Sequence, residues 1–270
     1  MKFLWTLVLY VFAAAGVVLV AVYLAVLLGL TKTPGILDSG RFFRPLAGEE
    51  GKAEDYAWTK SEEWPALTAA IEKDAKVIEQ AARVAQVDPR LMAANLMVEQ
   101  LRLYTSEREL FKKVFAPLQV LGSQNQFSWG VMGMKRETAI EVENNLKDKN
   151  SSFYLGTRYE NLLDFESVDK ENERFTRMVN PKDHYYSYLY AALYLKQVET
   201  QWQKAGYAIG HKPEVLSTLF NIGFTNSKPN ANAKVGGAEI EVRDTKYSFG
   251  GLAHEFYYSN QLTNLFPIAQ

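Results

Sequence analysis

Glu99 is the residue whose surroundings in this sequence could most readily support chemistry. It closes a run from Leu91 to Val98 in which Asn95 is the only side chain that is neither aliphatic nor Met. A carboxylate among apolar neighbours has its charged form disfavoured by desolvation, so its pKa rises and it can hold a proton near neutral pH. Glu99 is therefore a candidate general acid. The alternatives are a surface position or an ion pair with a residue such as Arg102.

A helix is expected to hold Glu99 inside the protein. Asp88 is a favourable N-cap residue, and Pro89 suits the first helical position, where a missing N–H costs nothing. Because the following residues are almost wholly apolar, most of the helix over 88–100 must lie in the interior. The chain is predicted to be organised around this buried helix.

Helical spacing also dominates the remaining sequence. Apolar positions recur at this spacing over 61–85, and Thr59 with Glu62 has the spacing of a capping box, although Ser61 competes as the cap. The fold class is predicted to be mainly α, with little or no sheet. Further helices are expected over 105–120, 135–146, 152–165, 180–205, 213–222 and 251–262, with a charged connection over 166–179 and a short hairpin around 236–242.

Five tyrosines lie within the predicted helix over 180–205. Aromatic rings at this density could form a wall on which sugars stack, whereas rings at helical spacing commonly belong to the core and its rim. Both interpretations remain open for Tyr185, Tyr186, Tyr188, Tyr190 and Tyr194.

The composition excludes several classes of function. The 270 residues include 30 Lys and Arg against 31 Asp and Glu, and a net charge of -1 gives no electrostatic case for nucleic acid as a partner. The absence of cysteine excludes disulfides, cysteine-bound zinc and thiol catalysis. Because His184, His211 and His254 are scattered without the spacing of metal ligands, neither a metal nor another cofactor is expected.

The N-terminus is predicted to be a membrane segment. Residues 3–30 contain no charged side chain, and this run is long enough to span a bilayer. We therefore expect a transmembrane signal anchor over 1–30, a linker rich in Pro and Gly over 31–58, and a helical domain over 59–270. The competing interpretation is a signal peptide cleaved near residues 13–16.

Three segments in a fixed order resemble the lysozyme-like lytic transglycosylases, in the branch of the soluble and goose types. Residues 87–94 leading to Glu99 resemble the family's helix that ends in its catalytic Glu. Residues 128–139 are similar to its Gly-Leu-Met-Gln segment followed by Thr-Ala. Residues 219–223 stand where the family has Ala-Tyr-Asn-Ala-Gly, and residues 191–195 resemble the helix that precedes this motif.

The sequence departs from the family pattern at three positions. Gln100 follows the catalytic position in place of Ser, Gly133 replaces the Gln of the second motif, and Phe220 replaces a Tyr. The interval between Glu99 and Gly130 also suggests an inserted loop or helix. A divergent member of the superfamily is therefore expected.

The resemblance implies a lysozyme-like fold and cleavage of the peptidoglycan glycan strand, with Glu99 as the catalytic residue and no cofactor. It also implies a domain on the outer side of the cytoplasmic membrane, in the periplasm or extracytoplasmic space, held by the N-terminal helix and open to an envelope protein complex as partner. Substrate contacts are expected from Ser128, Gly130, Val131, Met132, Gly133, Phe220, Asn221 and Tyr257.

Other functions stay open at this point. A hydrolase of the goose-lysozyme type would need a second carboxylate to activate water, for which Glu107, Glu109 and Asp183 are candidates. The departures at Gln100 and Gly133 instead suggest an inactive protein that binds glycan or scaffolds an envelope assembly. A helical domain with chance matches to the family motifs is the remaining alternative.

Overall fold

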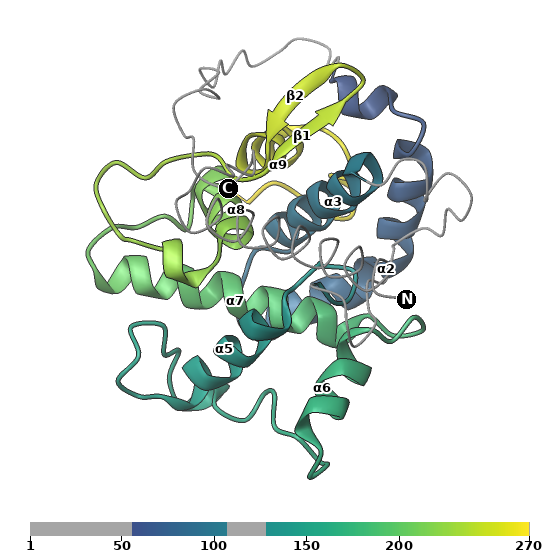
Figure 1. Ribbon diagram of the computed structural model, residues 1–270. Helices are drawn as coiled ribbons and strands as arrows, with labels where there is room; N and C mark the ends of the chain where they lie inside the picture. Colours follow the sequence, from purple (N-terminus) through teal and green to yellow (C-terminus); the bar gives the residue numbers. More distant parts are fainter. Residues whose placement is uncertain (1–55, 107–127, 270) are drawn as a thin grey trace, which may run out of the picture. The chain divides into compact units, whose positions relative to one another are not determined.

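A computed structural model describes residues 56–106 and 128–269 (Figure 1). The predicted membrane segment 1–30, almost all of the predicted linker and most of the predicted helix over 105–120 lie outside these residues. Within the described ranges, no helix has the length and apolar character that crossing a membrane requires.

The described part of the chain is mainly α, as predicted. Its two strands form one antiparallel hairpin in which Ile240 pairs with Tyr247. Short 3-10 helices lie at Ala57–Lys60, Thr157–Tyr159 and Phe224–Asn226. The α-helices are α2 (Trp64–Ala85), α3 (Pro89–Ser106), α5 (Arg136–Lys147), α6 (Lys170–Met178), α7 (Tyr185–Lys204), α8 (Pro213–Ile222) and α9 (Phe249–Tyr258), and the strands are β1 (Glu239–Val242) and β2 (Thr245–Ser248).

Helix α3 is the central element, because α2, α7, α8, α9 and β1 all contact it (Figure 1). The predicted start of this helix is confirmed, since Asp88 Oδ1 accepts a hydrogen bond of 2.8 Å from the backbone N–H of Arg90. Every residue from Arg90 to Leu101 is buried. A helix that is apolar on nearly all sides needs neighbours on all sides, and α3 has them.

The helices over 61–85, 135–146 and 213–222 are confirmed as α2, α5 and α8 within a few residues. The predicted capping box is wrong, because α2 starts without a side-chain cap and Thr59 Oγ1 donates to the carbonyl of Tyr56 instead. The domain also begins before residue 59. Trp58 is fully buried, and its indole N–H donates to Glu255 Oε2 over 3.1 Å.

Two predictions for the middle of the chain are wrong. Residues 152–165 form only the 3-10 turn Thr157–Tyr159, because Gly156 has φ +103° and interrupts the backbone. The supposed connection over 166–179 contains α6. Asp169 caps this helix by accepting a 3.0 Å hydrogen bond from the N–H of Asn172, a local signal that the high charge of the segment concealed.

Helix α7 begins at Tyr185 rather than at residue 180. Side-chain oxygens of Asn180 and Asp183 accept hydrogen bonds from the N–H groups of Lys182 and Tyr185, and these bonds form turns in place of a longer helix. The predicted end near residue 205 is confirmed. The predicted hairpin exists, but its turn lies at residues 243–244 rather than at the glycines 236–237, and α9 ends at Tyr258 rather than near residue 262.

Candidate functional site

Glu99 lies inside the protein and is paired with Arg102. Arg102 Nη2 donates to Oε1 of Glu99 over 2.5 Å, and Nε donates to Oε2 over 3.1 Å, so both carboxylate oxygens are engaged. The side chain of Glu99 is 4% exposed and that of Arg102 is 30% exposed. The surface position considered for Glu99 is therefore wrong, whereas the ion pair with Arg102 is present.

Two opposing effects act on the pKa of Glu99. Burial raises the pKa, because the charged form loses its hydration, while the hydrogen bonds and positive charge of Arg102 lower it. Burial has the larger effect, and the pKa lies above the ordinary value of a glutamate. The expected raised pKa is therefore present.

We expect a carbon NMR titration of the carboxyl groups to place the midpoint of Glu99 above the ordinary value of 4.5. The signal that disappears in Glu99→Gln identifies the residue. Arg102→Gln should move the midpoint higher still, since it removes the one effect from the described residues that lowers the pKa. A midpoint at or below 4.5 in the wild type would contradict this account of the site.

Residues 129–134, here called the glycine loop, form a tight turn against this carboxylate. Backbone hydrogen bonds of 2.7 and 3.0 Å join Trp129 to Met134 and close the loop. Gly130 and Gly133 have φ values of +68° and +58°, in the left-handed region that favours glycine. A Cβ atom on Gly133 would lie 2.0 Å from Oε1 of Glu99. The loop backbone therefore lies so close to the carboxylate that only glycine fits at position 133 without a shift of Glu99.

Helices α3 and α7 hold the glycine loop in place. Gln100 Nε2 donates to the carbonyl of Val131 over 2.6 Å, and the N–H of Met132 donates to Ser187 Oγ over 3.3 Å. Val131 and Met132 are fully buried. On Gly130, a Cβ atom would lie 2.4 Å from Ser187 Oγ. The loop is thus fixed from two sides, and Glu99 is placed beneath it.

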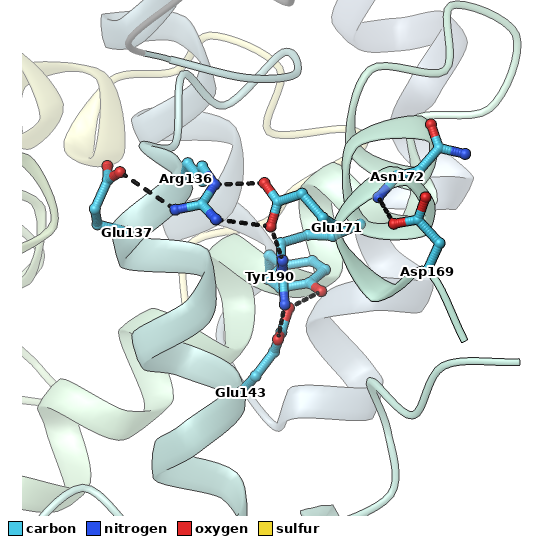
Figure 2. A network of polar contacts seen from close by, with 8 residues as sticks. Arg136, Glu137, Glu143, Asp169, Glu171, Asn172 and Tyr190 are labelled. Atoms are coloured by element: carbon cyan, nitrogen blue, oxygen red, sulfur yellow. Dashed lines mark hydrogen bonds and ion pairs between the residues drawn. The ribbon is translucent and has the colours of Figure 1, made fainter. Parts of the chain in front are cut away.

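Helix α6 supports the loop from a third direction. The ring of Phe175 meets that of Trp129 edge to face at 5.3 Å, and the carbonyl of Met178 would lie 2.5 Å from a Cβ on Gly130. A network of charged groups ties this helix to α5 and α7 (Figure 2). Its members are Arg136, Glu143, Glu171, Arg174 and Tyr190, with Arg174 donating twice to Glu143 over 2.6 Å and Tyr190 donating to the same carboxylate over 2.6 Å.

Of the predicted contacts, the structure gathers Gly130, Val131, Met132 and Gly133 at Glu99 or in the loop beside it, and half-buried Ser128 precedes that loop. Phe220 and Asn221 lie on α8, which contacts α3. The ring of Phe220 packs near those of Tyr194 and Phe249, at 5.5 and 6.4 Å. Asn221 Oδ1 accepts a 2.8 Å hydrogen bond from the N–H of Ala238 and so holds the segment before β1.

Tyr257 lies near the other end of α3 from Glu99, and its predicted contact with substrate stays a prediction. Its hydroxyl donates to Asp88 at the start of α3. Glu99 lies eleven residues further along the same helix, a rise of about 16 Å. Tyr257 therefore supports the opposite end of the helix.

Of the two interpretations left open for the tyrosines of α7, the core position is confirmed for three of them. Tyr188, Tyr190 and Tyr194 are fully buried, and their hydroxyls bond to Asp74, Glu143 and the carbonyl of Leu219. These three rings belong to the core. Tyr185 and Tyr186 are half-buried at the start of α7.

Gln100 and Ser187 support the site without having been predicted as site residues. In the sequence, Gln100 stands out only as a departure from the pattern of the family that the chain resembles. Ser187 is a small polar residue among tyrosines, which is a visible signal, but its partner Met132 is 55 residues away. Their shared role depends on tertiary contacts.

Comparisons of the chain with family models, with curated proteins and with solved structures give no match.

Proposed function

We propose that this protein is a peptidoglycan lytic transglycosylase with Glu99 as its single acid and base. The observation that supports this most directly is the buried carboxyl of Glu99, of raised pKa, lying against the backbone of Gly133. A general acid must hold a proton near neutral pH and must be held in a defined geometry. The raised pKa favours the protonated form and the contact with Gly133 fixes the geometry, so both features agree with a general acid, and the order of the motifs resembles that of the family.

In this mechanism, protonated Glu99 gives its proton to the glycosidic oxygen between N-acetylmuramic acid and N-acetylglucosamine as that bond breaks. The resulting carboxylate takes the proton of the muramyl C6 hydroxyl, whose oxygen closes onto C1. The product is a 1,6-anhydro sugar, formed without water. The neighbouring acetamido group would shield the cation-like transition state, so no second carboxylate is required.

The goose-type hydrolase has less support among the described residues. Asp183 is exposed and accepts a hydrogen bond from the N–H of Tyr185 at the start of α7. It therefore has a structural role in the turn before that helix. Glu107 and Glu109, the other candidates for a second carboxylate, lie outside the described residues.

The proposed location follows from the substrate. Peptidoglycan lies outside the cytoplasmic membrane, so residues 1–30 would anchor the chain with its N-terminus inside and the domain outside. A reporter fused after Gln270 should be active only outside the cytoplasm. Activity confined to the cytoplasm would contradict this topology.

Mass spectrometry of purified peptidoglycan, incubated with the full-length protein in detergent, tests the proposed reaction. We expect fragments that end in 1,6-anhydro-N-acetylmuramic acid. Reducing ends in their place would identify a hydrolase and direct attention to a second carboxylate. The absence of any fragment from several glycan sources would favour a protein that only binds glycan or scaffolds an envelope assembly.

Gly133→Ala should lower the rate of glycan cleavage at least about tenfold, the loss that corresponds to about 1.4 kcal/mol in the barrier. The new methyl group would meet Oε1 of Glu99 and displace the carboxyl. Gly206→Ala is the matched control, because Gly206 also has a positive φ, +86°, but no atom lies within 4 Å of its Cβ position. An equal loss of activity in both variants would show that backbone strain, rather than contact with Glu99, is responsible, and a Gly133→Ala variant with the wild-type rate would contradict the prediction.

A further inference from the structure

Arg102 is the more exposed member of the pair at the proposed catalytic site. Its guanidinium donates to both oxygens of Glu99, and its side chain is 30% exposed while that of Glu99 is 4% exposed. Two charge-assisted hydrogen bonds favour the ionised carboxylate. The closed pair therefore makes Glu99 less ready to hold a proton than burial alone would, and opening the pair favours the protonated acid that a glycosidic oxygen needs.

The chemistry of Arg102 restricts what can open the pair. A planar guanidinium matches a carboxylate through two parallel hydrogen bonds, and a neutral hydroxyl or acetamido oxygen does not replace that charge. A substrate that carries its own carboxylate offers Arg102 an equivalent partner. A neutral substrate must instead separate the ion pair without compensation, which is costly when one charge is buried.

Peptidoglycan offers such a group close to the bond that breaks. The lactyl carboxyl is attached to the same muramyl ring whose C1 reacts, and it is ionised when no peptide is joined to it. A stem peptide converts this carboxyl into a neutral amide and places the remaining carboxylates further away on a mobile chain. A peptide-free, or denuded, strand is therefore the form that presents an anion within reach of an arginine beside Glu99.

We propose that Arg102 recognises the lactyl carboxylate of a peptide-free muramyl residue, so that this site selects denuded glycan strands. The inference rests on the proposed function and adds the substrate form to it. When Arg102 turns to the substrate, Glu99 stays buried beside Gly133 without its cation and takes a proton from solvent. Binding of the acidic strand thus prepares the acid that cleaves it.

The test compares three substrates with the full-length protein. These are denuded strands, the same strands with their lactyl carboxyls converted to N-methylamides, and strands that retain their stem peptides. The wild type should cleave denuded strands with kcat/KM at least about tenfold higher than either of the others, the factor expected for a hydrogen bond to a charged group. In Arg102→Gln the ratios should fall to about one.

Two further variants serve as controls. One keeps the charge of Arg102 without its planar shape, and the other removes an arginine away from the site. Arg102→Lys keeps the charge but loses the planar fork, so its preference should be intermediate. Arg83→Gln removes an exposed arginine of α2 and should keep the wild-type ratios. Thermal unfolding of each variant confirms that it is folded.

The pH dependence tests the electrostatic pairing of Arg102 with Glu99, on which the inference depends. On the methylamide substrate, kcat/KM falls as the pH rises through the pKa of Glu99 in the free enzyme. Because Arg102 lowers that pKa, Arg102→Gln should move this decline to higher pH. An unmoved decline would overturn the inference.

The outcomes distinguish this inference from the proposed function. Cleavage of all three substrates at similar rates by the wild type, or an equal loss on all three in Arg102→Gln, would overturn the selection by Arg102 and leave the transglycosylase intact. Failure to cleave any of them would overturn the proposed function and this inference together.

Discussion

Glu99→Gln should lower the rate of glycan cleavage by about a hundredfold to ten-thousandfold, the range that a positioned general acid contributes. The amide has nearly the size of the carboxyl, so it fits beside Gly133, and its oxygen can still accept from Arg102. The variant should therefore stay folded while losing the transferable proton. The measurement is the release of soluble fragments from peptidoglycan, with circular dichroism to confirm the fold.

Glu72→Gln is the matched control, because Glu72 lies on the exposed face of α2. It makes the same chemical change and should leave the rate unchanged. Wild-type activity should also decline as the pH rises through the raised pKa of Glu99, since only the protonated form donates. A Glu99→Gln variant that kept wild-type activity would exclude Glu99 as the acid and favour another carboxyl.

Glu99 and its helix could be predicted because their signals are local. The cap at Asp88, the proline after it and the apolar run all lie within thirteen residues of sequence, 88–100. The contact with Arg102 is also local, since residues three apart share a helix face, and the sequence alone therefore offers this ion pair as an alternative. Whether burial or the arginine controls the pKa depends on depth in the protein, which sequence spacing does not determine.

The glycine loop shows where sequence reasoning stops. Its two glycines suggest that the backbone lies close to another part of the protein, but the sequence does not say to which part. The contact of Gly130 with Ser187 and of Gly133 with Glu99 joins segments 57 and 34 residues apart. Compared with the family that the sequence resembles, Gly133 is the loss of a Gln side chain. The structure shows that the backbone at Gly133 leaves no room for a side chain beside Glu99.

Arg90→Met should lower the free energy of unfolding by more than about 3 kcal/mol, because it removes the donors of several buried hydrogen bonds at once. Arg90 is fully buried at the start of α3. Its guanidinium donates to five backbone carbonyls, at 2.5 to 3.1 Å, in and after the last turn of α9: those of Phe256, Tyr257, Ser259, Gln261 and Phe266.

These carbonyls explain why the loss should be large. The last carbonyls of a helix have no partner within it, and a cation there also complements the helix dipole. A methionine of similar length fills the space but leaves the carbonyls buried without these donors. A lysine in Arg90→Lys keeps the charge, but it offers fewer donors than arginine and lacks the planar guanidinium. Urea unfolding measures the difference, with exposed Arg83→Met as control, expected within about 0.5 kcal/mol of the wild type. If Arg90→Met were as stable as that control, the C-terminal segment would be held by its apolar contacts, chiefly buried Phe266, rather than by the arginine.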